Sequence, residues 1–312
     1  MLDLCGHRVG TQLFDRCREG VRHDGFGLTQ GSERDVDVEK LPSTLRSDSP
    51  SAPARRRRQS FFCQTKSLNQ LEDCFQSLLE EPGLGVLTAE AGVGKTAAIR
   101  NICSQLPSPD FRVIYLCNTA ASPFDIYRSL ALELGLSPAH RKSQLWWALK
   151  TELVRLLDEQ RTVPIIVLDE AQHLSDVFLA DLSGFLNFAF DTRSAAALWL
   201  VGLPSLAQRL RMQLHAPLAS RVAAQVQLAA LERDDFKALV EHGIKAAGSR
   251  DKLLTDSAVE LLFRVCRGIP RIASRLLRAA LKEAHARNQN VVDDAALKAA
   301  VETLTLVEEV KP

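Results

Sequence analysis

Residues 89–96 read Ala89-Glu-Ala-Gly-Val-Gly-Lys-Thr96, and they follow a short apolar run over residues 84–88 that predicts a strand. Apolar residues at helical spacing come directly after them. A strand, a glycine-rich turn and a helix in this order are typical of a loop that binds phosphates. Gly92 and Gly94 allow the backbone to approach the anion closely, and the helix points its positive dipole end at it.

The last residues of the stretch carry the charge and the hydroxyl that a nucleotide requires. Lys95 is placed to neutralise the β- and γ-phosphates, and Thr96 to offer its hydroxyl to Mg²⁺. Ala89 stands where the strict pattern has glycine, and alanine adopts a positive φ only at a cost. We expect the nucleotide to bind at Ala91, Gly92, Val93, Gly94, Lys95, Thr96 and Ala97.

A second motif, Ile165-Ile-Val-Leu-Asp-Glu170, predicts a buried strand that ends in two acids. Such a strand exposes both carboxylates at the edge of the sheet where ligands bind in open α/β folds. We expect Asp169, with Thr96, to hold Mg²⁺, and Glu170 to orient and polarise the attacking water. The alternative is that the two acids cap the helix that follows.

Two arginines stand in positions that suit charge stabilisation. Arg221, in Leu218-Ala-Ser-Arg-Val222, precedes a predicted strand and is expected to reach the nucleotide of a neighbouring subunit. Arg271, in Gly268-Ile-Pro-Arg271, opens a predicted helix and is expected to fold over the γ-phosphate. We assign both to the catalytic set together with Glu170.

The pattern along the chain predicts an α/β protein with a parallel sheet covered by helices on both faces. The expected strands are 84–88, 111–117, 164–168, 196–201 and 222–228, and the second of them is expected to be buried. Residues 59–230 form this α/β nucleotide-binding domain. Helices near 232–247, 255–266, 270–287 and 293–303 form a small all-α lid domain over residues 231–304, followed by a tail at 305–312.

Residues 1–58 show weak apolar periodicity, with a Ser/Pro-rich stretch and the run Arg55-Arg-Arg-Arg58. We interpret them as a disordered or poorly ordered basic arm, or as the result of an uncertain translation start. The basic run could contact DNA phosphates, but a solvated linker is the favoured interpretation.

Composition places further bounds on the protein. The formal net charge is only +1, so charge alone does not indicate nucleic acid. No apolar run reaches the ~18 residues of a membrane helix, so no membrane association is expected. The 7 cysteines form no CxxC pair. This favours a reduced, cytoplasmic protein without a zinc site or disulfide framework.

These motifs resemble those of the AAA+ ATPases from about Phe61 to about Thr303. Residues 89–96 are similar to Walker A, residues 165–170 to Walker B, Ser220-Arg221 to the arginine-finger motif and residues 268–271 to sensor 2. The resemblance implies an AAA+ P-loop NTPase core, a five-stranded parallel sheet sandwiched by helices, followed by the small helical lid.

Within AAA+, the chain resembles the transposon ATP-binding proteins of the TniB/TnsC type and their ExeA-like relatives. The matching residues lie at 83–88, 122–127, Asp169-Glu-Ala-Gln-His-Leu174, 186–188 and Leu200-Val-Gly-Leu-Pro204. This resemblance implies a bacterial, Mg²⁺-dependent ATPase. It also implies ATP-dependent assembly of copies into a ring or helical filament on double-stranded DNA, with recruitment of a transposase and stimulation of insertion. A target-selection protein is a further candidate partner. Hydrolysis then releases the polymer.

Leu203 departs from the family, whose members commonly place a polar sensor-1 residue there. An apolar side chain cannot hydrogen-bond the γ-phosphate or the water, so hydrolysis is expected to be slow unless another polar group substitutes.

The resemblance also implies where DNA would lie. Loops after the second and third strands line the pore of such polymers. We therefore consider DNA contacts at Asn118, Thr119, Ser122, Arg141 and Lys142, with His173 and Ser175 as further candidates and Arg141–Lys142 in a loop. Trp146 and Trp147 face different directions on a helix, so one is expected in the core and the other on a partner surface.

Two other functions remain open. One is an ATP-switched scaffold of a secretion assembly, as in the ExeA-like relatives. The other is a clamp-loader-like repair ATPase, which primed DNA or a clamp would stimulate.

Overall fold

The computed structural model describes residues 65–107, 109–117, 119–188, 194–246, 253–287 and 289–303. They all belong to one of the chain's two compact units, which comprises Met1–Leu4 and Ser60–Pro312, whereas the other unit is Cys5–Gln59. The arm expected over residues 1–58 and the tail expected over 305–312 lie outside the described residues.

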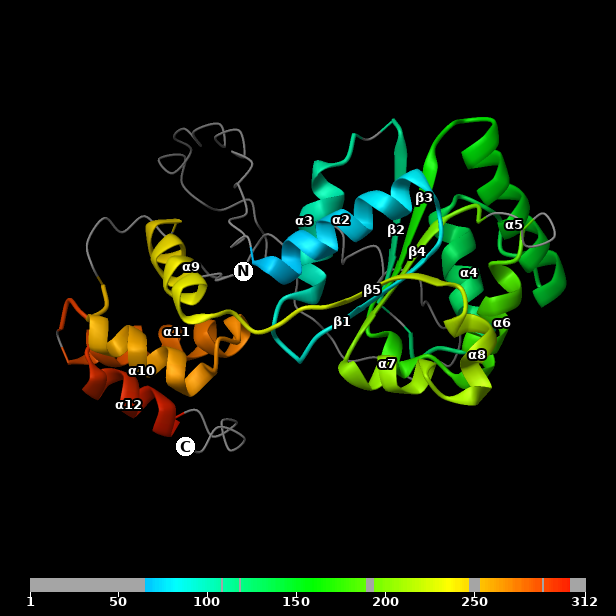
Figure 1. Cartoon of the computed structure of the whole chain (residues 1–312). Coiled ribbons are helices and arrows are strands. Elements are labelled where there is room, and N and C mark those ends of the chain that lie inside the picture. The colour runs from blue at the N-terminus through cyan, green and yellow to red at the C-terminus, as the bar shows by residue number, and fades with distance from the viewer. Residues whose placement is uncertain are drawn as a thin grey trace, which may run out of the picture. The chain divides into compact units, whose positions relative to one another are not determined.

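A sheet of parallel strands forms the centre of the α/β part (Figure 1), in the spatial order β2-β3-β4-β1-β5. The strands are β1 (Leu84–Thr88), β2 (Phe111–Leu116), β3 (Val163–Leu168), β4 (Ala197–Gly202) and β5 (Val222–Gln227). Each agrees with its predicted segment to within a residue at either end. The predicted parallel sheet is therefore confirmed.

The two edge strands are more exposed than the central three. Val113 of β2 is 41% exposed and Arg112 is also exposed, while only Ile114 of this strand is fully buried. The prediction that the second strand is buried was therefore wrong. The reason is its place in the sheet: an edge strand has a neighbour on one side only, and the apolar run in the sequence does not reveal the spatial order of the strands.

Helices cover both faces of the sheet, and alternate residues of each strand point to opposite faces. Ile165 and Val167 of β3 pack with α2 (Lys66–Glu80) and α3 (Lys95–Gln105). Ile166 and Leu168 belong to the layer on the other face. That second layer contains α4 (Pro123–Glu133), α5 (Lys142–Asp158) and α6 (Asp176–Phe185).

Aromatic residues fix both helical layers. Phe75 of α2 stacks on Trp199 of β4, with ring centroids 5.3 Å apart, and both side chains are fully buried. Such a pair contributes about 0.5–1.5 kcal/mol beyond its buried area. On the opposite face, Tyr127 lies against Phe178 and Phe185.

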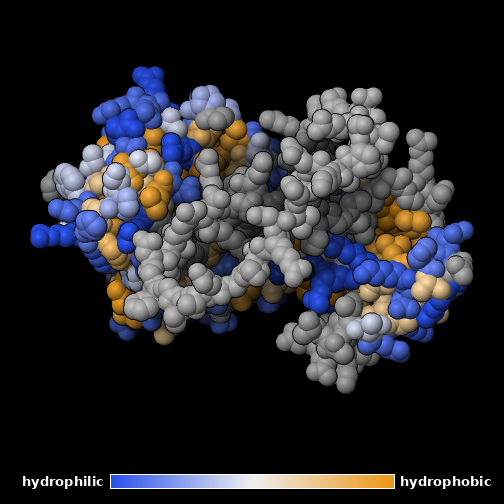
Figure 2. Space-filling view, turned by 180° about the vertical axis from the view of Figure 1, so that it is seen from behind, coloured by the Kyte–Doolittle hydropathy of each residue, from blue (hydrophilic) through white to orange (hydrophobic). Residues whose placement is uncertain are grey.

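The two adjacent tryptophans of α5 differ as predicted in their burial. The Trp146 ring packs against Phe185, whereas the Trp147 side chain is 74% exposed. The partner for Trp147 remains a prediction. On the face seen in Figure 2, hydrophobic residues are interspersed with hydrophilic ones, as is usual for a protein surface.

The residues after 231 form helices with a hydrophobic cluster of their own. They are α9 (Arg233–Ala246), α10 (Asp256–Cys266), α11 (Pro270–Ala286) and α12 (Asp294–Thr303). Thr255 caps α10, because its hydroxyl accepts a hydrogen bond of 3.1 Å from the Ala258 N–H. None of the helices in the described part of the chain is long and apolar enough to cross a membrane.

Short helices between β3 and β5 were not predicted. They are η4 (Ala171–His173), α7 (Pro204–Leu210), η6 (Gln213–His215) and α8 (Ala216–Ala219). Segments of this length are too short to show helical periodicity. They are nevertheless important here, because they hold the residues that follow the two acids of β3.

Candidate nucleotide site

The phosphate-binding loop lies between the end of β1 and the start of α3. Gly92 has φ +87° and Gly94 has φ +118°, a left-handed region that favours glycine. Ala89 is buried, and it is not among the described non-glycine residues with positive φ. Alanine at this position therefore carries no backbone strain, and the departure from the strict pattern does not disturb the loop.

Helix α3 begins at Lys95, directly after Gly94, and its first turn has no side-chain cap. The first N–H groups of a helix have no partner within the helix, so they remain available to an anion. The positive end of the helix dipole lies at the same place. The loop and the first turn of α3 thus have the geometry of a phosphate site.

The Lys95 side chain points into this loop and is 7% exposed. Its Nζ donates hydrogen bonds to the backbone oxygens of Ala89, at 2.9 Å, and Glu90, at 3.3 Å. Burial lowers the pKa of Lys95, and the negative charges of Glu170 and Asp169 oppose this shift. The ammonium and the two acids predicted from separate motifs are therefore close enough to interact.

Asp169, at the end of β3, is 2% exposed and accepts hydrogen bonds from three donors. Thr96 Oγ1 and the Tyr115 hydroxyl donate to Oδ2, at 2.5 and 2.8 Å, and the Glu170 N–H donates to Oδ1 at 2.8 Å. A hydroxyl and a carboxylate at this separation are ligands that suit Mg²⁺. The residues present fit a magnesium ion bound with a nucleotide.

Tyr115 is a residue of this site that the sequence analysis missed. It belongs to β2, one strand away from Asp169. Burial raises its pKa, and the neighbouring charge of Asp169 raises it further, so the hydroxyl remains protonated and donates. A tyrosine near the end of a largely apolar strand was the available signal, but only the pairing of β2 with β3 identifies its partner.

Glu170 follows Asp169 in a left-handed conformation, with φ +54°, and it is exposed. Its Oε2 accepts a hydrogen bond of 2.7 Å from Gln172 Nε2. Glu170 makes no side-chain cap to η4, and α6 is capped by Ser175, whose hydroxyl accepts from the Phe178 N–H. The capping alternative for the two acids therefore finds no support.

Arg271 lies at the start of α11, next to the phosphate-binding loop. Its N–H donates to the Gly92 oxygen at 3.2 Å. A Cβ at Gly92 would lie 2.9 Å from the Arg271 Cβ, so glycine is required there for the close approach as well as for the backbone angle. The positive charge of Arg271 contributes to lowering the pKa of Lys95.

Arg221 lies at the opposite end of the strands. The next residue, Val222, pairs with Leu84 at the first residue of β1. The phosphate-binding loop follows the last residue of β1, about 16 Å away at ~3.3 Å per residue. Lys150 is close to Arg221, whose charge acts with burial to lower the pKa of Lys150. The structure therefore does not bring Arg221 to the nucleotide site of its own chain.

The candidate DNA contacts after β2 make hydrogen bonds within the chain. The buried Thr119 donates its hydroxyl to the Glu170 oxygen at 2.7 Å. Ser122 caps α4 and accepts from the Asp125 N–H at 3.2 Å. Asn118 lies outside the described residues.

The expectation that Lys142 lies in a loop was wrong. Lys142 is the first residue of α5 and Arg141 is its N-cap. Lys142 forms an ion pair with Asp181 of α6, so the first residue of α5 contacts the neighbouring helix. Arg141 and Lys142 are exposed on the surface, and so are His173 and Ser175.

Leu203, the expected sensor position, follows β4 and is half-buried. Its N–H donates to Gln172 Oε1 at 3.1 Å. Gln172 therefore contacts both Glu170 and the end of β4, and it is the second residue of the site that sequence reasoning missed.

The comparisons agree with this geometry. Residues 78–210 match the protein family described as AAA domain. General secretion pathway protein A of Aeromonas hydrophila is 31% identical over 216 residues, which are 67% of this chain and 38% of that protein. The chain thus spans less than half of that relative's length.

Solved structures share the fold at low sequence identity. Cdc6p from Pyrobaculum aerophilum superposes with a TM-score of 0.62 and 17% identity, over 82% of this chain and 70% of that one. The Aeropyrum pernix ORC1 protein, solved in complex with DNA, has a TM-score of 0.57 and 19% identity over 76% of this chain and 64% of that one. Residues 78–210 therefore match the AAA domain family, and the described residues share the fold of the AAA+ P-loop NTPases.

Proposed function

We propose that this protein binds ATP with Mg²⁺ at the loop of residues 91–97 and hydrolyses it slowly. The observation that carries the proposal is the hydrogen bond between Thr96 and Asp169 beside the buried Lys95. It joins Thr96 of α3 to Asp169 at the end of β3, two residues from separate sequence motifs that were both predicted to hold Mg²⁺.

Each side chain then has one role. The loop N–H groups and Lys95 bind the phosphates, and Arg271 approaches them from α11. Mg²⁺, held by Thr96 and through water by Asp169, would neutralise charge on the phosphate oxygens. Glu170 accepts a proton from water, whose oxygen bonds to the γ-phosphorus as the bond to the bridging oxygen breaks and ADP leaves with the electron pair.

The position of Arg221 supports an assembly of several copies. Arg221 is too far from its own loop to stabilise charge there, so it acts on the nucleotide of a neighbouring copy. ATP bound between subunits would then couple hydrolysis to the assembly and release of a ring or filament.

Steady-state ATPase measurements test the proposed chemistry. Lys95→Ala should abolish turnover by preventing binding, whereas Glu170→Gln should bind ATP and lower turnover by about 100-fold or more. Lys237→Ala, at an exposed position of α9, is the matched control and should behave as wild type. Undiminished turnover in Glu170→Gln would remove this residue from the proposed chemistry.

For the cellular role, we propose a regulator of transposition that assembles on double-stranded DNA with ATP and recruits a transposase. The support is the resemblance to TniB/TnsC-type proteins in the residues around the site. Electron microscopy and DNA binding with a slowly hydrolysed ATP analogue should reveal a DNA-bound ring or filament, which Glu170→Gln should prolong. Binding to DNA that is the same without nucleotide, or in Lys95→Ala, would argue against this role.

A secretion role is the second candidate, and the 31% identity to general secretion pathway protein A favours it. Under this proposal the same ATPase would drive the assembly of a secretion apparatus, and duplex DNA would be no ligand. ATP-dependent oligomers that form equally well with and without DNA would support it over the transposition role.

A further inference from the structure

Gln172 occupies a position between the water-activating acid and the end of β4. Its Nε2 donates to Glu170 Oε2 at 2.7 Å, and its Oε1 accepts from the Leu203 N–H at 3.1 Å. One amide side chain thus uses its donor on the acid and its acceptor on the backbone of the neighbouring strand's end. Leu203 contributes no polar side chain of its own there.

The end of β4 is shaped to admit this side chain. A Cβ at Gly202 would lie 2.7 Å from Gln172 Oε1 and 3.3 Å from the Gln172 backbone nitrogen. Any residue with a side chain would therefore have to displace Gln172. The glycine and the glutamine form a matched pair, and this observation is independent of the hydrogen bonds.

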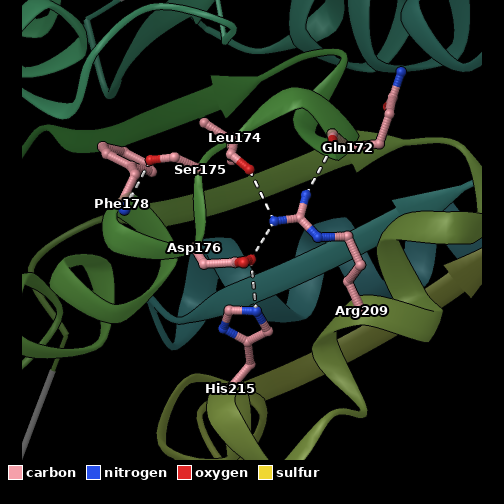
Figure 3. A network of polar contacts seen from close by, with 7 residues as sticks. All are labelled: Gln172, Leu174, Ser175, Asp176, Phe178, Arg209 and His215. Atoms are coloured by element: carbon pink, nitrogen blue, oxygen red, sulfur yellow. Dashed lines mark hydrogen bonds and ion pairs between the residues drawn. The ribbon is translucent and has the colours of Figure 1, made fainter.

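The backbone oxygen of Gln172 accepts a hydrogen bond from Arg209 of α7 (Figure 3). Arg209 Nη1 donates to the Gln172 oxygen at 2.8 Å, and Nη2 donates to the Leu174 oxygen at 2.9 Å. Asp176 accepts from Arg209 at 2.5 Å and from the buried His215 at 3.0 Å. The segment after Glu170 is therefore fixed at several points, which limits where the Gln172 side chain can go.

We propose that Gln172 is the positioning residue for Glu170. Its amide holds Oε2 of Glu170 in place, which leaves Oε1 to accept the proton of the attacking water. Its Oε1 accepts a hydrogen bond from the Leu203 N–H at the end of β4. A movement of β4 would therefore also move Glu170 through the Gln172 side chain. This inference rests on the proposed ATPase activity and assigns the polar partner of its acid.

Gln172→Glu tests the proposal, because it keeps the side-chain shape and an oxygen for the Leu203 N–H but removes the donor to Glu170. We expect kcat for ATP to fall about 10-fold or more, with the KM for ATP and the melting temperature close to wild type. Gln76→Glu, at an exposed position of α2, is the matched control and should leave all three unchanged. A purely structural role predicts wild-type kcat in Gln172→Glu, and this result would overturn the inference.

Gln172→Ala controls for the negative charge that Gln172→Glu adds beside Glu170. It should lower kcat by a similar factor at unchanged KM, and a wild-type kcat here would also overturn the inference. Glu170→Gln, measured alongside, separates the two proposed roles. If it retains turnover, the proposed role of Glu170 fails, and if it is inactive while both Gln172 variants are active, only the role of Gln172 fails.

Discussion

At the scale of single residues, three hydrogen bonds compensate the buried carboxylate of Asp169, which we propose binds Mg²⁺. A buried charge is costly unless it is paired or hydrogen-bonded. Here donors come from α3, from β2 and from the next residue of the chain. If Thr96 gave its hydroxyl to a bound Mg²⁺, Tyr115 would remain as a side-chain donor to Oδ2.

Tyr115→Phe is therefore expected to weaken Mg-ATP binding by about 5–10-fold, which corresponds to a hydrogen bond of ~1–1.4 kcal/mol. Calorimetric titration measures this change. Tyr127→Phe, at the chain's other tyrosine, is the control and should bind as wild type because that ring packs among phenylalanines away from the acids. Equal affinities for both variants would show that Tyr115 has no part in holding Asp169.

At the scale of elements, the segment between β3 and α6 connects Glu170 with α7 and η6. Arg209 binds two of its backbone oxygens and the Asp176 carboxylate in one planar group, a geometry that lysine could not reproduce. The short helix α7 thus fixes the segment after Glu170 through the hydrogen bonds of Arg209.

Gly202→Ala should lower kcat about 10-fold, because the added Cβ displaces the Gln172 side chain. In a Gln172→Ala background the same change should cost little further activity, since contacting residues are not additive. Gly184→Ala is the control: its Cβ would meet only the Trp146 ring, at 3.9 Å. If the effects of Gly202→Ala and Gln172→Ala on kcat were fully additive, this would count against the coupling of Gly202 with Gln172.

Asp176 gives this segment a pH dependence of defined sign. Its pKa is lowered, first by the hydrogen bond from Arg209 and then by the charges of Arg209 and His215. Because the folded pKa lies below the unfolded value of about 3.9, the stabilisation is present above that pH and is lost as the pH falls through the folded pKa.

Asp176→Asn should therefore lower the melting temperature at pH 7, and the difference from wild type should close as the pH falls below about 3.9. Thermal unfolding between neutral and acid pH measures this. Asp73→Asn, on α2, is the control and should leave the melting temperature at pH 7 unchanged. A difference in melting temperature that widens in acid would contradict the lowered pKa of Asp176.

At the scale of the whole molecule, Arg271 and Arg221 lie at opposite ends of the parallel sheet, and we propose different tasks for them. Arg271 lies beside the loop at the carboxyl end of β1, and Arg221 lies at the amino end of the adjacent strand. The proposed nucleotide site and the Arg221 charge are about 16 Å apart at ~3.3 Å per residue, so we propose that Arg221 acts on the site of another copy.

Arg221→Ala should bind ATP as wild type but lose most turnover, and mixing it with Lys95→Ala should restore part of that turnover. In mixed oligomers, the intact nucleotide site of an Arg221→Ala subunit can lie next to the intact Arg221 of a Lys95→Ala subunit. Arg278→Ala, at an exposed position of α11, serves as the control and should keep full activity. If the mixture is as inactive as its components, Arg221 does not act between copies.

The sequence predicted those parts of the molecule that depend on residues close together in the chain. Residues 89–96 and 165–170 identified the loop, the strands beside it and both acids, because each motif is continuous. Tyr115 and Arg209 were missed because their partners come from other strands and helices, and Gln172 was missed because a sequence does not show that its side chain turns back to Glu170 and reaches the end of β4. The exposure of β2 and the Lys142–Asp181 ion pair were missed for the same reason: both depend on which elements become neighbours in space.

The most direct test of the central claim is a calorimetric titration of the protein with ATP in the presence of magnesium. The structure predicts saturable binding by the wild type and affinity at least about 100-fold weaker in Lys95→Ala, a difference of ~2.7 kcal/mol. Absence of binding by the wild type, or equal affinity of Lys95→Ala, would contradict it.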